Sequence, residues 1–219
     1  MNIKLVCLSD THSRHENVHI PAGDILVHAG DFTRNGDLIE LEQFNQFLGQ
    51  LPHPHKIVIA GNHDFCCEKL PQLSRRILTN CIYLQDEAVV VRGIKFYGAP
   101  WQPWFCHWAF NLPRGEKLRA KWELIPEDTD VLITHGPPQG YMDQDLQQKS
   151  VGCEELLARV NIIRPRLHVF GHIHENAGIA KNQYTTFINA SICDYYYAPV
   201  NPPVVVEFTV DTNPSIVIC

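Results

Sequence analysis

The chain has 219 residues, of which 45% are apolar and 19% are charged, and its formal net charge is −6. That length supports one sizeable core but is short for two ordinary domains, and the balance of apolar and charged residues excludes intrinsic disorder. The negative charge disfavours a broad binding surface for long nucleic acids or for an anionic membrane, and no apolar run is long enough to span a bilayer.

Short apolar runs rich in valine, isoleucine and leucine recur along the chain. Each run has the length of a β-strand and stops at a glycine, aspartate, histidine or asparagine, residues that commonly end strands. We therefore expect strands at residues 3–8, 25–29, 57–60, 131–134 and 167–170.

Two helices are predicted between these strands. Asp37 followed by Glu40 resembles a capping box, and apolar residues at helical spacing follow as far as Leu48. A second helix is expected at residues 152–163, where apolar side chains recur on one face and Pro165 follows. Strands that alternate with helices indicate an α/β fold with right-handed crossovers.

The C-terminal third follows a different pattern. Residues 184–189 and 204–210 have strand character with no helix between them, and residues 89–91 and 94–97 flank an Arg-Gly pair that is typical of a hairpin. These segments favour a mixed sheet, or two sheets packed together, over a purely parallel sheet. Because no repeat, low-complexity segment or linker interrupts the pattern, a single domain over residues 1–219 is predicted.

Cysteine usage and the N-terminus bear on the compartment. The eight cysteines form no C-x-x-C pair and no regular framework, which favours reduced thiols over disulfides. The N-terminal apolar stretch is too short for a signal peptide. We therefore expect a soluble, cytoplasmic protein.

Polar side chains follow five of the predicted strands, at the point where each strand ends. In α/β sheets, ligands bind outside the carboxyl ends of the strands, and core packing does not require polar residues there. The residues concerned are Asp10 and His12 in LSDTH, Asp31 in HAGD, Asn62, His63 and Asp64 in AGNHD, His135 in LITHG, and His172 and His174 in VFGHIH.

The residue types in this set point to a metal centre. Leaving out His63 and Asp64, two carboxylates, one amide and four imidazoles could supply the ligands of two metals if one aspartate bridges them. Oxygen and nitrogen donors without a thiolate suit Mn, Fe, Zn or Ni. A pair of dications about 3.5–4 Å apart lowers the pKa of a bound water and stabilises both oxygens of an in-line displacement at phosphorus.

Between Asp10 and His174 the chain carries, in order, the motifs D-x-H, G-D, G-N-H-D, T-H-G and G-H-x-H. This series resembles the calcineurin-like metallophosphoesterase superfamily. The likeness to the small metallophosphoesterase-domain-containing proteins of animals extends to the segments SDTHSR, GDILVHAGDFT, KIVIAGNHD, YGAPWQPWF, FNLPRG, THGPP and LHVFGHIHE. The resemblance implies an α/β fold, an αββα sandwich of two mixed β-sheets flanked by helices, with a dinuclear site at one edge.

The resemblance also implies roles for individual residues, with Asp31 as the ligand that bridges the metals. His63 is expected beside the metals without ligating them, as the donor of a proton to the leaving oxygen. Asp64 is expected to orient the His63 imidazole or to cap the following helix. The implied ligands are Asp10, His12, Asp31 and His174 for one metal, and Asp31, Asn62, His135 and His172 for the other.

Three further residues are candidate substrate contacts. Arg14 could meet a phosphate as a forked donor, and the alternative is an exposed arginine without a functional contact. Trp101 and Trp104 belong to an aromatic segment, residues 98–115, that either stacks on a planar leaving group or packs a long loop onto the sheet.

The predicted function is hydrolysis of cyclic nucleotides or other small phosphodiesters through attack by a metal-activated hydroxide. The implied cofactors are two divalent metal ions, with Mn²⁺ preferred and Fe, Zn, Ni or Mg as alternatives. Two other functions stay open: a phosphomonoesterase, and a nucleotide-binding or scaffold protein of low activity. The expected partner is a small phosphoester or nucleotide substrate, with no long nucleic acid and no membrane.

Overall fold

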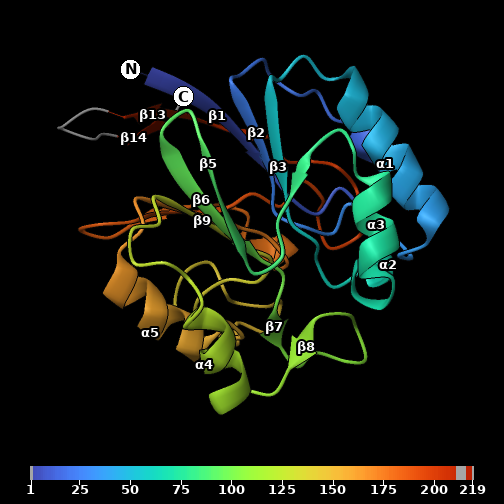
Figure 1. Ribbon diagram of the computed structural model, residues 1–219. Helices are drawn as coiled ribbons and strands as arrows, with labels where there is room; N and C mark the ends of the chain where they lie inside the picture. The colour runs from blue at the N-terminus through green and yellow to red at the C-terminus, as the bar shows by residue number, and fades with distance from the viewer. Residues whose placement is uncertain (1, 211–215, 219) are drawn as a thin grey trace.

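The computed structural model describes residues 2–210 and 216–218, and these residues form two six-stranded β-sheets that share a core (Figure 1). The first sheet has the order β14 (Ile216–Ile218), β13 (Val204–Thr209), β1 (Asn2–Leu8), β2 (Ile25–His28), β3 (His55–Val58) and β4 (Ile82–Tyr83). The second has the order β11 (Gly178–Lys181), β12 (Thr186–Asn189), β10 (Leu167–Phe170), β9 (Val131–Thr134), β6 (Ile94–Ala99) and β5 (Glu87–Val91). Two short strands, β7 (Gln102–Pro103) and β8 (Asn111–Leu112), pair separately.

Both sheets are mixed, as the sequence predicted. Strands β1 to β4 run parallel in the first sheet, and β6, β9, β10 and β12 run parallel in the second. Antiparallel pairing extends the first sheet beyond β1 through β13 and β14, and extends the second sheet at both ends through β11 and β5. The predicted hairpin is formed by β5 and β6. All five predicted apolar runs are strands: the bounds of β9 and β10 are those predicted, and the bounds of β1, β2 and β3 differ from the prediction by one or two residues.

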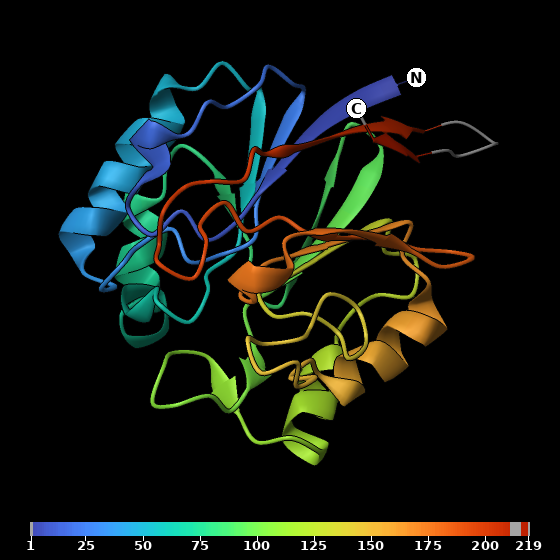
Figure 2. The same cartoon turned by 180° about the vertical axis from the view of Figure 1, so that it is seen from behind.

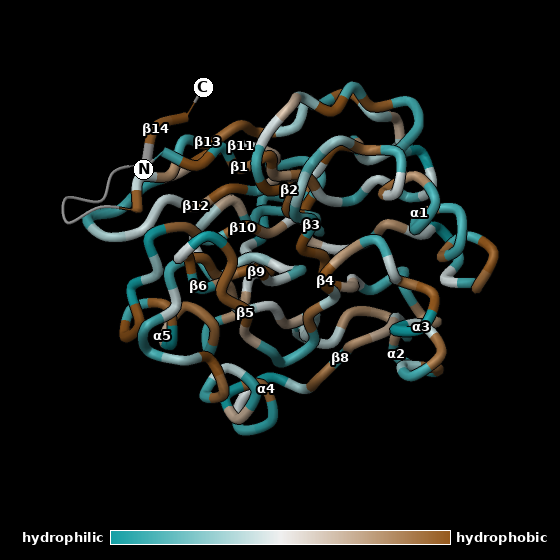
Figure 3. The backbone as a smooth tube through the Cα atoms, turned by 45° about the horizontal axis from the view of Figure 1, so that its top comes forward, coloured by the Kyte–Doolittle hydropathy of each residue, from teal (hydrophilic) through white to brown (hydrophobic). Residues whose placement is uncertain are grey.

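The strands are apolar without interruption because most of them are buried on both faces. In β2, Ile25 and Val27 pack between the two sheets, whereas Leu26 packs against the outer helices. All three side chains are fully buried. A strand in this environment shows a continuous apolar run instead of alternation. Figure 3 shows the same distribution, with hydrophobic segments along the central strands and hydrophilic turns on the outside of α1 (Leu38–Gln50).

Helices cover the outer face of each sheet, which completes the expected αββα sandwich (Figure 2). The N-cap predicted for α1 is present, because the backbone N–H of Glu40 donates to the Asp37 carboxylate at 2.9 Å. The helix predicted at residues 152–163 begins later, after an N-cap at Cys153. The first sheet is covered by α1, α2 (Phe65–Lys69) and α3 (Pro71–Ile77), and the second by α4 (Glu116–Trp122) and α5 (Glu154–Ile163); two short 3-10 helices are η1 (His15–Asn17) and η2 (His174–Asn176).

The longest helix, α1, has 13 residues. Within residues 2–210 and 216–218, no helix combines the length and the apolar character that crossing a bilayer requires. The cysteines of these residues are free thiols, and Cys219 lies outside the described part of the chain.

Candidate metal centre

The loops that follow β1, β2, β3, β9 and β10 meet at one edge of the sandwich. Backbone N–H groups of Asp10 and His12 donate to the carbonyls of Gly30 and Asp31, both at 2.9 Å, which holds the first two loops together. The N–H of His172 donates to Asp10 Oδ2 at 3.0 Å and connects the second sheet to the first. The carboxyl ends of strands from both sheets therefore form one site.

Four of the predicted ligands have a left-handed backbone: φ is 55° at Asp10, 42° at His12, 55° at Asp31 and 71° at His172. This conformation costs about 1–2 kcal/mol for a residue with a Cβ atom. Such conformations cluster at functional sites, where the surrounding structure fixes them.

Two motif glycines are required by close approach to the carboxylates. A Cβ atom on Gly61 would lie 2.3 Å from Asp31 Oδ1, and one on Gly171 would lie 1.9 Å from Asp10 Oδ2. Any side chain at these positions would displace a predicted ligand. The glycines of G-N-H-D and G-H-x-H therefore make room for the site.

The structure brings all seven predicted ligands together. His174 Nε2 lies 3.3 Å from Asp10 Oδ1 and 3.2 Å from His12 Nε2. Across the bridging position, Asp31 Oδ2 lies 3.8 Å from His12 Nε2 and 3.4 Å from His135 Nε2. Two more residues complete the group of ligands predicted for the second metal. Asn62 Oδ1 lies 2.8 Å from His135 Nε2, and the His172 ring centroid is 5.1 Å from that of His135.

The hydrogen bonds of the imidazoles show that this site suits cations. His135 Nδ1 bonds to the carbonyl of Ala29 at 3.0 Å and His174 Nδ1 to that of Asp194 at 2.9 Å, so both Nδ1 atoms are donors. Each neutral ring then turns an Nε2 lone pair towards a carboxylate oxygen. Two acceptors at this separation repel each other unless a proton or a metal cation lies between them.

The pKa values of the histidines also show that a proton or a cation is favoured between each imidazole and its carboxylate. Burial lowers the pKa of His135, but the Asp31 carboxylate outweighs it and the pKa rises to about 9. Burial likewise lowers the pKa of His174, but the hydrogen bond to Asp10 raises it to about 9. Burial lowers the pKa of His12 to about 4, which keeps that imidazole neutral and able to ligate. In the metal-free protein, His135 and His174 carry the protons that metals would replace.

His63 lies beside this cluster. Its Nε2 is 4.0 Å from Asp31 Oδ2, and its Nδ1 donates to the carbonyl of Arg34 at 2.7 Å. The ring packs against Trp108, with 4.1 Å between the centroids. His12, Asp31 and His63 also form a group close enough to hold a metal, so His63 faces the same space as the predicted ligands.

Asp64 differs from both expectations. Its side chain makes no capping bond to α2, and the partner of His63 Nδ1 is the Arg34 carbonyl instead. The Asp64 carboxylate accepts the backbone N–H groups of Gly61, Asp31 and Thr33 at 2.7–2.9 Å, and the Thr33 hydroxyl at 2.7 Å. Asp64 therefore fixes the loops that carry the predicted ligands and does not orient the His63 ring.

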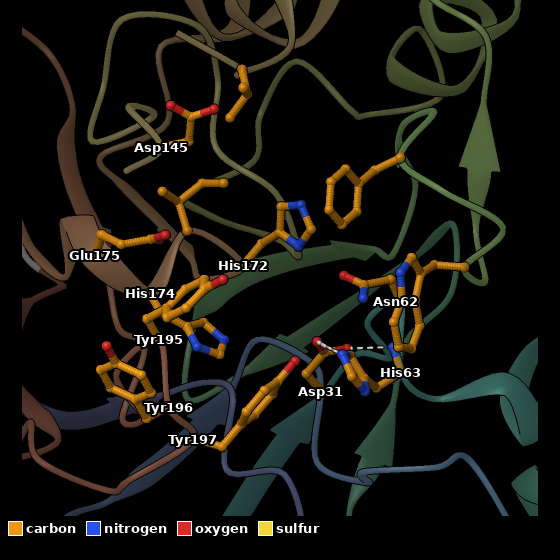
Figure 4. Close-up of a pocket in the computed structure, with 14 residues that line it drawn as sticks. Asp31, Asn62, His63, Asp145, His172, His174, Glu175, Tyr195, Tyr196 and Tyr197 are labelled. Atoms are coloured by element: carbon orange, nitrogen blue, oxygen red, sulfur yellow. Dashed lines mark hydrogen bonds and ion pairs between the residues drawn. The ribbon is translucent and has the colours of Figure 1, made fainter. Parts of the chain in front are cut away.

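A cavity of about 550 Å³ opens over the cluster (Figure 4). Asp31, Asn62, His63, His172 and His174 lie in its wall. Aromatic side chains and two carboxylates make up much of the rest: Phe105, Trp108, Tyr195, Tyr196, Tyr197, Asp145 and Glu175. The volume is in the range of small-molecule sites.

The three predicted substrate residues are not part of this wall. Trp101 is half-buried: its indole N–H donates to Asp86 at 2.7 Å and Lys121 Nζ lies 4.0 Å above its ring. Trp104 lines a neighbouring cavity of about 480 Å³, and Arg14 lines neither. The packing alternative holds for Trp101, and the structure does not support a contact between Trp101 or Arg14 and a ligand in the main cavity.

Several residues at the site belong to no motif of the sequence. Ser191 donates from Oγ to Asp10 Oδ2 at 2.8 Å, and the Asp194 carbonyl orients His174. Both follow β12, in a segment without periodicity. Three consecutive tyrosines in that segment, residues 195–197, were the available signal, because an aromatic cluster in a loop suggests a ligand contact.

Comparisons with known proteins agree with this geometry. The family model described as calcineurin-like phosphoesterase matches residues 3–176. Metallophosphoesterase domain-containing protein 1 of Homo sapiens is 48% identical over 235 residues, covering 96% of this chain and 72% of that protein. A UPF0046 protein of Caenorhabditis elegans is 41% identical over 227 residues, covering 94% of this chain and 80% of its own length. A crystal structure of a Thermus thermophilus protein matches with a TM-score of 0.64 at 12% identity, covering 100% of this chain and 99% of that one, and shows the shared fold.

Proposed function

The chain belongs to the calcineurin-like phosphoesterase family and is a metal-dependent phosphoesterase, and from this premise we propose that it hydrolyses small phosphodiesters, nucleotides among them. The observation that carries the proposal is the convergence of imidazole Nε2 atoms and two carboxylates below an open cavity. Two divalent cations, with Mn²⁺ as our first choice, would supply an activated water and neutralise charge on the phosphoryl oxygens there.

The chain's own residues prepare the reaction. Asp10, His12, Asp31 and His174 are the proposed ligands on one side of the bridge, and Asn62, His135 and His172 those on the other. The Arg34 carbonyl accepts a hydrogen bond from His63 Nδ1, so that His63 Nε2 faces the cavity. We assign His63 Nε2 as the donor of the proton that the leaving oxygen receives.

Two features of the cavity favour a diester. A diester carries one negative charge, whereas a phosphomonoester near neutral pH carries nearly two. Asp145 and Glu175 in the wall disfavour the more highly charged substrate. Phe105 and Trp108 offer apolar rings to a planar organic group such as a nucleobase.

The test compares bis-p-nitrophenyl phosphate with p-nitrophenyl phosphate after metal removal and reloading with Mn²⁺. We expect turnover of the diester to depend on metal and to exceed that of the monoester. Preference for the monoester would contradict the phosphodiesterase assignment and favour a phosphatase. Binding of a nucleotide without turnover of either ester would contradict hydrolysis and favour a receptor.

A further inference from the structure

The turn at residues 194–198 holds Tyr197 in an unfavourable conformation. Its φ of 62° lies in the left-handed region, which a bulky aromatic residue rarely adopts. The Asp194 carboxylate accepts the N–H groups of Tyr196 and Ala198, and the Asp194 N–H donates to the Ala198 carbonyl, all at 2.9 Å. The hydrogen bonds of the turn therefore fix the conformation that the side chain disfavours.

The same turn is tied to the metal centre. The Asp194 carbonyl accepts both His174 Nδ1 and the backbone N–H of Tyr197, each at 2.9 Å. One oxygen atom thus orients a predicted metal ligand and places the Tyr197 backbone. The position of the tyrosine is coupled to the position of that ligand.

The Tyr197 ring stands against the imidazoles of the site. Its centroid lies 4.7 Å from that of His12 and 5.6 Å from that of His174, both nearly perpendicular. Figure 4 shows the hydroxyl pointing into the cavity, towards Asp31 and His63. This hydroxyl makes no hydrogen bond to another residue in the described part of the chain. The Tyr197 hydroxyl is therefore held in place and can donate a hydrogen bond to a ligand in the cavity.

We propose that Tyr197 is a catalytic residue whose hydroxyl donates a hydrogen bond to a non-bridging oxygen of the substrate's phosphoryl group. The proposal rests on the phosphodiesterase function proposed above. Negative charge spreads over the phosphoryl oxygens as the ester bond breaks, and a donor held in place beforehand stabilises that charge. The phenol donates and keeps its proton, so this contact adds no proton transfer.

The decisive variant is Tyr197→Phe, which keeps the ring and its contacts and removes only the hydroxyl. With bis-p-nitrophenyl phosphate and Mn²⁺-loaded protein, we expect kcat to fall about tenfold to a hundredfold, with a smaller change in KM. Metal content and Tm should match the wild type.

Tyr184→Phe is the control. It makes the same chemical change at a tyrosine that is 47% exposed and is not among the residues lining the cavity over the metal centre. Unchanged turnover is expected for this variant. A lower metal content or Tm in Tyr197→Phe would assign Tyr197 a structural role and overturn the proposal.

A binding measurement separates this proposal from the proposed function. Calorimetric titration of the Mn²⁺-loaded protein with inorganic phosphate needs no turnover, and Tyr197→Phe should bind phosphate about tenfold more weakly than the wild type. If the wild type cleaves no diester, the phosphodiesterase function fails and the phosphate titration alone decides the role of Tyr197. The role of Tyr197 would be overturned if the wild type and Tyr197→Phe bound phosphate with equal affinity and, where turnover is measurable, cleaved the diester equally fast.

Discussion

His63 is held by one ring nitrogen and presents the other to the cavity. Because Nδ1 donates to the Arg34 carbonyl, only Nε2 can transfer a proton to a bound ester. No carboxylate of the described residues bonds to Nδ1, so the ring is oriented by a neutral backbone group. This arrangement makes a direct prediction about leaving groups.

Replacing His63 with alanine should lower kcat about 100-fold or more for a diester with an alkyl leaving group, and less for one with p-nitrophenolate. The better leaving group needs less protonation as its bond breaks. Steady-state kinetics with the two substrates measure the difference, and elemental analysis should find unchanged metal content. His19→Ala, at an exposed position, is the control. An equal loss with both substrates would remove His63 from proton transfer.

Asp64 acts on the backbone of the loops. Its carboxylate accepts three N–H groups and one hydroxyl, whereas an asparagine would turn an NH₂ group towards two of these donors. We therefore expect Asp64→Asn to lower the free energy of unfolding by about 2 kcal/mol or more and to weaken metal binding. Urea unfolding measures the first effect, with the exposed Asp128→Asn as control. Wild-type stability in Asp64→Asn would contradict this role.

The start of helix α1 supports the position of His63. Glu40 accepts the N–H groups of Arg34, Asn35 and Gly36 at 2.8–3.2 Å, and so fixes the segment whose Arg34 carbonyl holds His63. The capping box was therefore half right: Asp37 caps Glu40, but the Glu40 side chain holds the preceding loop.

Glu40→Ala should lower kcat about tenfold for the alkyl diester with little change in metal content, because the loop loses its common acceptor. Glu42→Ala, at an exposed position of the same helix, is the matched control and should behave as wild type. A loss of metal equal to the loss of turnover would show that Glu40 supports the ligands and not His63.

The strands were predictable because burial on both faces leaves a continuous apolar run, as in β2 and β9. Helices α2 and α3 were not, because five and seven residues are too few to show helical periodicity. The ligands could be located because they directly follow predicted strands. Tyr197 could not, because its place beside His12 depends on a turn formed 185 residues later in the chain (197 − 12).

The partners of Asp64 and Trp101 illustrate the same limit. The motif put Asp64 beside His63 in sequence, but folding turned its carboxylate towards donors of its own loop and of the loop after β2. The aromatic segment made Trp101 a candidate contact for substrate, but in the folded chain its indole N–H bonds to Asp86. Local pattern identifies residue types, whereas long-range packing decides which atoms meet.

For the whole molecule, the metal centre joins the two sheets. In the metal-free protein the His135–Asp31 and His174–Asp10 pairs cross from one sheet to the other. The pKa of each histidine rises to about 9, so the stability from these pairs is complete below pH 6.5 and is lost as the pH rises through 9. Metals compete with the same protons and bind more tightly over that range.

We therefore expect the Tm of chelated protein to fall between pH 6.5 and 9, and the Tm gained on adding Mn²⁺ to grow over the same interval. Differential scanning fluorimetry at several pH values, with and without chelator, measures both. Its control is the exposed-site variant Asp128→Asn, which should follow the wild type. A metal-induced gain that stays constant with pH would contradict proton displacement from His135 and His174.

We infer that seven side chains hold two divalent cations with Asp31 between them. The test is the metal content of the chain after chelation, reloading with Mn²⁺ and removal of free ions. We expect two Mn²⁺ per wild-type chain and a loss of both from Asp31→Ala, and circular dichroism can verify that the variant is folded. Fewer than two ions in the wild type, or two ions retained by Asp31→Ala, would contradict it.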